Sequence, residues 1–582
     1  MAMNASDYFG SLLGALGLAG IMGVLIALPG SAEPSPQPAP PSSPMSRPLP
    51  EGLFSDWPAN QKPELVLVLT GQQHSYLKFC GCTERQLGGF ERRYNFIAKL
   101  RERGWPVVSV DLGDLVTLQS GTQVEQSLLK FDTAIRALAA LDYAAIALGE
   151  HDFKLDLFKA LADNVFQNPA KFPPLLCGNM ADRSVTFPGP NGSVIESMVI
   201  RSGDGMPRVG IVGIAGPSVM AQGAALNLRF ETINTPQGPQ MSGKPALQAA
   251  LAKMDQEKVP FRVLLYQGEF ESARSVAGAP NALGQVDPTF ADKFDVILCL
   301  SAEEEPPARA DMVGKTMIVR VGQRGRHVGV VGIFRDANGG FDKHYRFVEM
   351  SEDFETDRDR EALNPVLKIL EDYARQVKDL QLVKTVPQIA HPVQVQLPNE
   401  KVTFIGSEQC KKCHIKEFAI WQQDAIGSKK KHSHSKAFEA LVKYARKPKN
   451  RQFDPECVVC HTVGYGYQTG YHGEDSAKFK EVGCENCHGP GNPHASNPDN
   501  LEFRRLMSPW KSHKDDLLPP PERMALGYNQ LTPAEQKIVK NVNDLCQKCH
   551  DTDNDPTFKF ELFWPRIRHG RGADPVLPAK PK

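Results

Sequence analysis

Short apolar segments rich in β-branched residues alternate with amphipathic segments between residues 63 and 350. The apolar segments have the length of buried strands, and the amphipathic ones, such as Glu91–Arg103 and Leu128–Leu141, show helical spacing. Strands that alternate with helices predict an α/β fold in which helices cover the faces of a sheet. The predicted strands are Glu64–Thr70, Val107–Leu112, Ala144–Leu148, Val209–Ile214, Val263–Tyr266, Val296–Leu300 and Met317–Val321.

Residues 351–400 connect this region to a second one at residues 401–582. Residues 354–382 repeat apolar side chains at intervals of three and four, which predicts one helix. We expect its apolar stripe to pack on one of the two flanking domains, with a dimer contact as the alternative. An extended segment near Pro387 to Pro398 follows. The stripe consists of Leu363, Val366, Leu367, Leu370, Tyr373, Ala374, Val377 and Leu380.

The N-terminal segments differ from the rest in composition. Phe9–Leu28 is apolar and uncharged and is about long enough to span a bilayer, and the small residues 30–32 suit signal-peptidase cleavage. Residues 1–32 are therefore predicted to be an export signal, either cleaved or kept as a membrane anchor. Residues 33–62 are rich in proline and serine, and we expect them to form an extended linker without a core.

The composition of the whole chain excludes one class of partner. The 582 residues carry 67 basic and 67 acidic side chains, which gives a net charge of +0. A nucleic-acid-binding protein is expected to show a basic excess or basic segments interleaved with aromatic residues. Neither is present, so we expect no nucleic-acid partner.

The C-terminal region carries the pattern Cys-x-x-Cys-His four times, which uses eight of the twelve cysteines. Two thiols of this pattern bind one porphyrin through thioethers and the histidine binds the iron, so it is the attachment signal of c-type haem. Zinc is the alternative, but a zinc site does not require a histidine directly after each second cysteine. The four motifs contain Cys410, Cys413 and His414; Cys457, Cys460 and His461; Cys484, Cys487 and His488; and Cys546, Cys549 and His550.

Four covalently bound haems also determine how this domain holds together. About 180 residues leave roughly 45 per haem, too few for separate apolar cores. The porphyrins are therefore predicted to form the interior, packed closely enough for electrons to pass between them. We expect a mainly α, loop-rich multihaem domain.

Several blocks within residues 402–569 resemble the cytochrome c554 family of tetrahaem proteins. The resemblance implies that the distal iron ligands are His434, His494 and His569. His432 competes with His434 for one position. The blocks that carry the resemblance are Ile405–Cys410, Trp421 with His432–Ala437, Cys457–Gly466, Val482–Gly491 with His494, and Phe563–His569.

Three distal histidines leave one of four irons without a second imidazole. The resemblance implies that this is the haem on His461, with an iron open to a small molecule. His472, Met507 or Met524 could instead complete its coordination, although His472, like His513, is otherwise expected at the surface. Irons with two imidazole ligands have low reduction potentials. We expect such potentials for the haems on His414, His488 and His550.

Residues 63–350 resemble the calcineurin-like metallophosphoesterases of the 5′-nucleotidase branch. The resemblance implies a four-layer αββα sandwich with a two-metal site on the loops that follow the strands. It also implies that Asp114 and His74 stand where the family has metal ligands, and His151 is retained in the third block. The blocks that carry the resemblance are Thr70–His74, Leu87–Arg93, Val110–Asp114 and Leu148–Phe153.

Other ligand positions of that family have changed in this chain. Gln72 and Gln267 stand in place of an aspartate and a histidine, Glu150 replaces an asparagine, and the histidines of the last block are absent. Two divalent ions held close together need several carboxylates and imidazoles. We therefore expect a domain without hydrolytic activity and without a functional dinuclear metal site. For His74 and His151, a residual single-metal site is the alternative to a role as polar rim residues.

Four cysteines stand outside the haem motifs. Cys80 and Cys82 are two residues apart and could bridge only with strain. They could instead hold a metal or pair with Cys177 and Cys299, and unpaired buried thiols are equally compatible with the sequence.

The sequence therefore predicts a periplasmic or otherwise extracytoplasmic tetrahaem cytochrome that exchanges electrons with redox partner proteins. An uncleaved segment 9–28 would bind it to the membrane. The α/β domain is expected to dock a partner or to position the cytochrome. The alternatives are a haem enzyme that acts on a small nitrogen or oxygen species at the haem on His461, and an active metal-dependent phosphoesterase.

Overall fold

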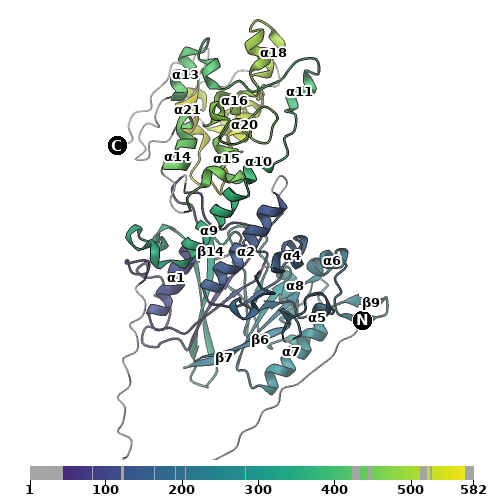
Figure 1. The fold of residues 1–582 in the computed structure, drawn as a ribbon. Coiled ribbons are helices and arrows are strands. Elements are labelled where there is room, and N and C mark those ends of the chain that lie inside the picture. Colours follow the sequence, from purple (N-terminus) through teal and green to yellow (C-terminus); the bar gives the residue numbers. More distant parts are fainter. Residues whose placement is uncertain are drawn as a thin grey trace, which may run out of the picture. The chain divides into compact units, whose positions relative to one another are not determined.

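Two β-sheets pack face to face within residues 63–350, and helices cover both outer faces (Figure 1). The computed structural model describes residues 43–81, 83–118, 123–162, 164–190, 192–203, 205–281, 283–422, 433–443, 448–511, 519, 521–524 and 527–569. The apolar segment Phe9–Leu28 lies outside the described residues. Within them, no helix is both long and apolar enough to cross a membrane.

The first sheet has seven strands. Strands β1 to β5 run parallel, and two antiparallel strands extend the sheet beyond β1. Its spatial order is β15 (Phe341–Glu349), β14 (His327–Arg335), β1 (Leu65–Thr70), β2 (Val107–Asp111), β3 (Tyr143–Ala147), β4 (Leu175–Leu176) and β5 (Ile195–Glu196).

The second sheet has six strands, with an antiparallel strand at each edge and parallel strands between. Its spatial order is β12 (Asp311–Val313), β13 (Thr316–Val319), β11 (Val296–Cys299), β10 (Phe261–Gln267), β7 (Met206–Ala215) and β6 (Met198–Gly203). A separate ribbon pairs β8 (Thr232–Thr235) with β9 (Gly238–Met241).

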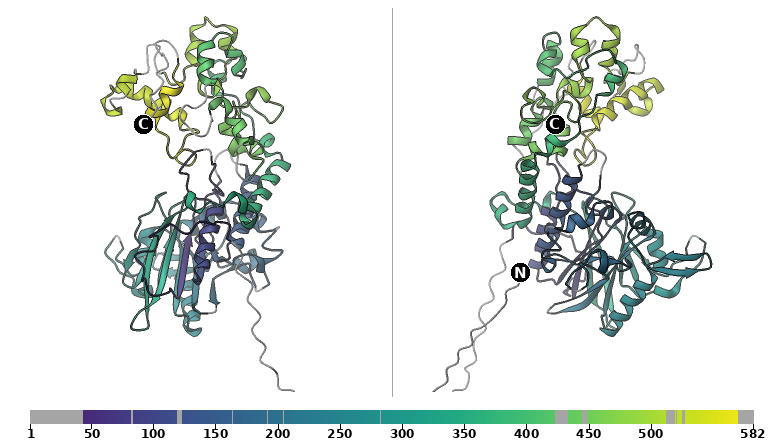
Figure 2. Two further views of the ribbon diagram at one scale, coloured as in Figure 1. Left: turned by 90° about the vertical axis from the view of Figure 1, so that its left-hand side faces the viewer. Right: turned by 45° about the vertical axis from the view of Figure 1, so that its right-hand side comes forward.

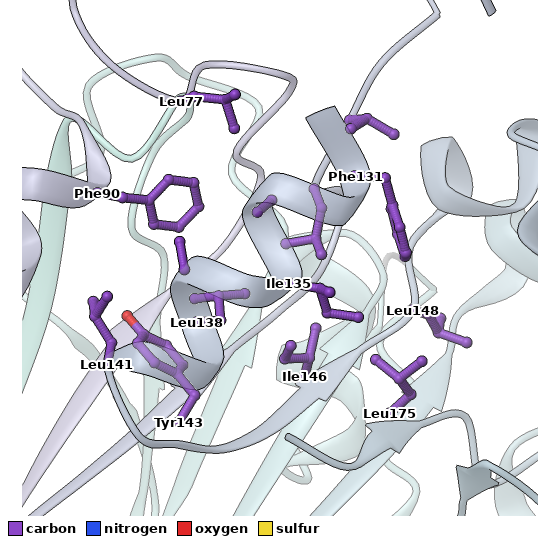
Figure 3. Packing of buried hydrophobic residues seen from close by; sticks show 14 of the residues in the cluster. Leu77, Phe90, Phe131, Ile135, Leu138, Leu141, Tyr143, Ile146, Leu148 and Leu175 are labelled. Atoms are coloured by element: carbon purple, nitrogen blue, oxygen red, sulfur yellow. The ribbon is translucent and has the colours of Figure 1, made fainter. Parts of the chain in front are cut away.

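Alternation of side chains along the strands builds the layers. Leu65 and Leu67 of β1 face the second sheet, whereas Val66 and Val68 face the helices. Figure 3 shows the helical side, where Phe131 and neighbouring residues of α2 pack over β3. The predicted αββα sandwich is thus confirmed. Its helices are α1 (Phe90–Glu102), α2 (Val124–Ala140), α3 (Glu150–Lys154), α4 (Leu157–Ala162), α5 (Arg183–Thr186), α6 (Pro217–Ala225), α7 (Lys244–Gln256) and α8 (Phe270–Val276).

The described part of the expected linker, residues 43–62, is not an extended spacer. Met45, Leu49 and Trp57 are buried in the core cluster on the helical side of the first sheet. Arg47 donates hydrogen bonds to backbone carbonyls of residues 352, 353 and 355. The prediction was wrong here because it weighed the prolines and overlooked apolar side chains large enough to anchor the segment.

The predicted single helix over residues 354–382 is also wrong. Two 3₁₀ turns precede α9 (Pro365–Asp379), which begins after the Asn364 cap, and Gln381 is left-handed before α10 (Leu382–Thr385). Proline at the first helical position and a capping side chain favour a new start over a continued helix. The apolar face of α9 packs on the sandwich and contacts α2.

The C-terminal region consists of short helices joined by long loops, as predicted (Figure 2, green to yellow). Its apolar clusters within the described residues are small. The helices are α11 (Pro392–Gln396), α12 (Ser407–Cys410), α13 (Ile415–Gln422), α14 (Ala437–Lys443), α15 (Pro455–His461), α16 (Cys484–His488), α17 (Asn492–Ser496), α18 (Leu501–Leu506), α19 (Pro521–Met524), α20 (Pro533–Cys546) and α21 (Phe560–Ile567).

Candidate haem-binding site

Each Cys-x-x-Cys-His motif lies on a helical turn. The second and third motifs fall inside α15 and α16, whereas α12 and α20 end at Cys410 and Cys546, the first cysteines of the other two. Residues three apart on a helix lie on the same side. Both sulfurs of a motif can therefore reach one ligand, with the histidine directly behind them.

One cavity of about 3800 Å³ is lined by all four motifs. The eight cysteines and four histidines of the motifs border it, and so do His434, His494 and His569. The structure thus places all fifteen of these residues around one cavity. A large cavity with apolar walls and sulfur and imidazole groups fits porphyrins better than it fits small ions.

Three pairs of imidazole rings face each other across this cavity. The ring centroids are 6.2 Å apart for His414 and His494, 6.0 Å apart for His550 and His434, and 5.8 Å apart for His488 and His569. Two imidazoles bound to opposite sides of one metal, each at about 2 Å, hold their centroids about 6 Å apart. Each pair joins one motif histidine to one of the three expected distal histidines.

The outer nitrogens of three of the four motif histidines are held by hydrogen bonds. Nδ1 of His461 bonds to the Ala437 carbonyl and Nδ1 of His488 to the Met507 carbonyl, both at 2.6 Å. Nδ1 of His550 bonds at 2.8 Å to a carboxylate, that of the buried Asp555. Such partners fix the tautomer in which Nδ1 carries the proton, so Nε2 is left to bind a metal.

The side chains that the sequence offered as further ligands for the iron on His461 lie in different places. His472 lies away from the cavity wall, where its Nδ1 bonds to Gln388 at 2.6 Å. Met524 does not line the cavity, whereas Met507 does. His432 and His513 lie outside the described residues.

The motifs also contact one another. The Cys410 thiol is within hydrogen-bonding reach of Cys484, and the Cys460 thiol is within reach of Cys549. Cys487 lies close enough to Cys549 for their charges to interact. These contacts connect the first motif with the third, the third with the fourth and the fourth with the second.

One wall of the cavity comes from the α/β domain, which sequence reasoning did not anticipate. Lys78, Phe79 and Cys80 line the cavity beside the haem motifs. Arg324 and Arg326 form ion pairs with Asp553 in the loop after the fourth motif. No sequence motif marks these residues, because they act through a surface that exists only once both regions have folded.

A second contact between the two regions lies at the second motif. Lys130 of α2 forms an ion pair with Glu456 at 2.5 Å, and Gln126 donates a hydrogen bond to Asp454 at 2.8 Å. Asp454 also caps α15 by accepting from the Glu456 backbone. The α/β domain thus contacts the C-terminal region beside the second and the fourth motif.

The two glutamines that replace family metal ligands are bonded to the protein itself. The Gln72 amide donates to the Ser301 carbonyl at 3.0 Å and accepts from the Ser301 backbone at 2.7 Å. The Gln267 amide donates to the Leu112 carbonyl. Both side chains are buried.

The retained histidines His74 and His151 lie edge to face, with ring centroids 5.1 Å apart. Burial, followed by the charges of His151 and Arg324, lowers the pKa of His74 to about 4. Burial also raises the pKa of Asp114, whose carboxylate accepts the His151 backbone N–H at 2.8 Å. Among the described residues, no three metal-binding side chains converge at this site.

The cysteines outside the motifs follow two patterns. Cys177 and Cys299 are free, buried thiols, and burial raises the pKa of each to about 12. Cys80 is disulfide-bonded, and Cys82 lies outside the described residues. Of the alternatives that the sequence left open, pairing of Cys177 or Cys299 with another cysteine is excluded.

Four Cys-x-x-Cys-His motifs that line one cavity form the pattern by which c-type haem is bound. Residues 409–489 match the family Cytochrome c554 and c-prime. Cytochrome c-554 of Nitrosomonas europaea is 33% identical over 99 residues, which is 15% of this chain and 39% of that protein. The chain therefore spans well under half of the curated relative that it matches.

Solved structures are similar to the α/β part of the chain. A 5′-nucleotidase precursor from Thermus thermophilus has a TM-score of 0.41 and 21% identity, over 56% of this chain and 60% of its own. A calcineurin-like phosphoesterase from Bacillus subtilis has a TM-score of 0.38 and 18% identity, over 54% of this chain and 97% of its own.

Glu485, inside the third motif, makes a testable contribution to the site. Its carboxylate is 3% exposed and accepts the backbone N–H groups of Ile405, Gly406 and Gly491 at 2.7–3.1 Å. We expect Glu485→Ala to destabilise the C-terminal region by about 2–4 kcal/mol, because buried donors lose their acceptor. Chemical unfolding followed by haem absorbance measures this.

The matched control is Gln547→Ala, at the same position of the fourth motif. Gln547 is exposed, so its truncation should leave the unfolding midpoint unchanged. Equal midpoints for the two variants would contradict the structural role of Glu485.

Proposed function

We propose that each of the four motifs binds one c-type haem and that the protein is a tetrahaem electron carrier. The observation that carries this proposal is the convergence of all four motifs on one cavity that three imidazole pairs span. The axial pairs would be His414 with His494, His488 with His569, and His550 with His434. Covalently bound haem supplies one-electron redox chemistry, and these residues hold and orient it.

The route of the electrons follows the contacts between motifs. Cys410 lies beside Cys484, Cys487 lies near Cys549, and Cys549 lies beside Cys460. We propose the order first, third, fourth and second haem, because electrons pass fastest between the closest groups. Redox partner proteins would exchange electrons at the two ends of this row.

The α/β domain is proposed to have no hydrolytic activity. Gln72 and Gln267 are engaged in hydrogen bonds within the protein, and both are neutral. Two divalent ions would therefore lack the negative charge that such sites supply. The domain instead forms part of the cavity wall and positions the cytochrome region.

An extracytoplasmic location follows from the same chemistry. Haem is attached to Cys-x-x-Cys-His motifs outside the cytoplasmic membrane, so the protein must be exported. The segment Phe9–Leu28 is the export signal under this proposal.

The number of haems is the direct test. The pyridine haemochrome spectrum of protein made in a host competent for cytochrome maturation should give four haems per chain. Cys457→Ala with Cys460→Ala should give three, because one porphyrin loses both thioether bonds. A wild-type protein with zinc at these cysteines, or with fewer than four haems, would exclude the proposal.

The axial pairs are tested by spin state. His434→Ala should convert one low-spin haem to high-spin in the electron paramagnetic resonance spectrum, because its iron loses the second imidazole. The control is His472→Ala, since this histidine bonds to Gln388 away from the cavity. An unchanged spectrum for His434→Ala would mean that another group binds that iron.

Hydrolysis is tested with bis(p-nitrophenyl) phosphate and nucleoside monophosphates in the presence of Mn²⁺. The wild type and Asp114→Ala should show the same background rate, because Asp114 has too few partners to bind a pair of ions. Manganese-dependent turnover that Asp114→Ala abolishes would restore the phosphoesterase alternative.

A further inference from the structure

His327, the first residue of β14, is a buried histidine whose polar atoms have no partner. His327 is 3% exposed, and neither Nδ1 nor Nε2 of its ring forms a hydrogen bond. Phe347 of β15 stacks on the ring with centroids 4.5 Å apart and planes 24° apart, which fixes the plane of the imidazole. Buried polar side chains nearly always have a partner, so two unbonded ring nitrogens indicate a ligand.

Two carboxylates complete a cluster at this position. Glu349, the last residue of β15, is the cross-strand partner of His327, and Glu305 comes from the loop after β11. One ligand atom from each of the three residues lies within 4.8 Å of the others. Within the described part of the chain, neither carboxylate forms an ion pair. The three groups are thus close together and not satisfied by one another.

We propose that Glu305, His327 and Glu349 bind one divalent transition-metal ion of the zinc class. An imidazole ligand disfavours Ca²⁺ and Mg²⁺, and the two carboxylates neutralise a charge of +2. Three protein ligands leave one tetrahedral position for water. Because both carboxylates are exposed, they can rotate onto an ion that enters from solvent.

This site is separate from both sites already described. Its residues do not line the haem cavity, and none stands at a ligand position of the phosphoesterase family. The neighbouring cation, Arg326, is paired with Glu304 at 2.9 Å and with Asp553. These two carboxylates offset part of its charge.

The site would join the loop after β11 to the edge of the first sheet. Glu304 in that loop pairs with Arg326, which in turn pairs with Asp553 beside the fourth haem motif. A bound ion would stiffen the surface of the α/β domain that contacts the haem region. Its role is structural, with an exchangeable water as the fourth ligand.

Isothermal titration calorimetry of the full-length holoprotein with ZnCl₂ tests the proposal. The wild type should bind one equivalent that Glu305→Gln and Glu349→Gln each weaken by at least about tenfold. Both residues are exposed, so these variants should fold even if His327→Gln does not. A single wild-type equivalent of zinc should also raise the unfolding temperature of the α/β domain.

The matched control is Glu303→Gln, which removes the same charge from the same loop. Glu303 pairs with Arg320 at 3.3 Å and is not part of the cluster, so zinc affinity should be unchanged. Asp114→Ala serves as the control for zinc at the old phosphoesterase position and should also retain the equivalent. Equal zinc binding in Glu303→Gln, Glu305→Gln and Glu349→Gln, or no uptake by the wild type, would overturn the proposal.

Discussion

In the proposed holoprotein, opposing imidazole rings about 6 Å apart would each bind one iron and so hold the C-terminal region together. Each pair joins segments that are distant in the chain, as His434 and His550 illustrate. The apolar clusters of this region are small, and its helices are short. Iron–imidazole bonds and thioethers would supply the cohesion that a hydrophobic core supplies elsewhere. Folding and haem attachment are then one process.

The α/β domain is more than an appended module. Arg324 connects the loop of Gln72 to the C-terminal region, since its backbone donates to the Gln72 carbonyl while its side chain pairs with Asp553. Gln72 in turn is bonded to Ser301. The loops that carry Gln72 and Arg324 thus support a wall of the cavity.

Local pattern was enough to predict the sandwich and the chemistry of the C-terminal region. Strands such as Val263–Tyr266 are continuous apolar runs, and Cys-x-x-Cys-His is a contiguous signal. The predictions that failed depended on tertiary contacts. Met45 and Trp57 lie in a proline-rich segment, and only the folded sandwich shows that a groove exists to bury them. Likewise, the predicted helix extended across Pro365, because apolar spacing alone does not show where one helix ends and another begins.

The site was predictable in its members but not in its arrangement. The fifteen residues proposed to bind haem could be named from motif and resemblance. Which histidine faces which depends on the path of the chain, which motif spacing does not determine. No sequence pattern indicates that Lys78 and Phe79 form part of the cavity wall. The cluster around His327 was equally hidden, because Glu305 and Glu349 are far from it in sequence and meet it only through strand register and a loop.

The hydrogen bond from His550 to Asp555 gives the fourth motif a distinct electronic character. A carboxylate draws the Nδ1 proton towards itself and gives the ring part of the character of an imidazolate, whereas the carbonyls beside His461 and His488 do so far less. The more electron-rich ring would stabilise ferric iron, so the fourth haem would be the hardest to reduce. In the proposed order, the fourth haem lies between the third and the second. Electrons would therefore pass through a haem of lower potential on their way between the first and third haems on one side and the second haem on the other.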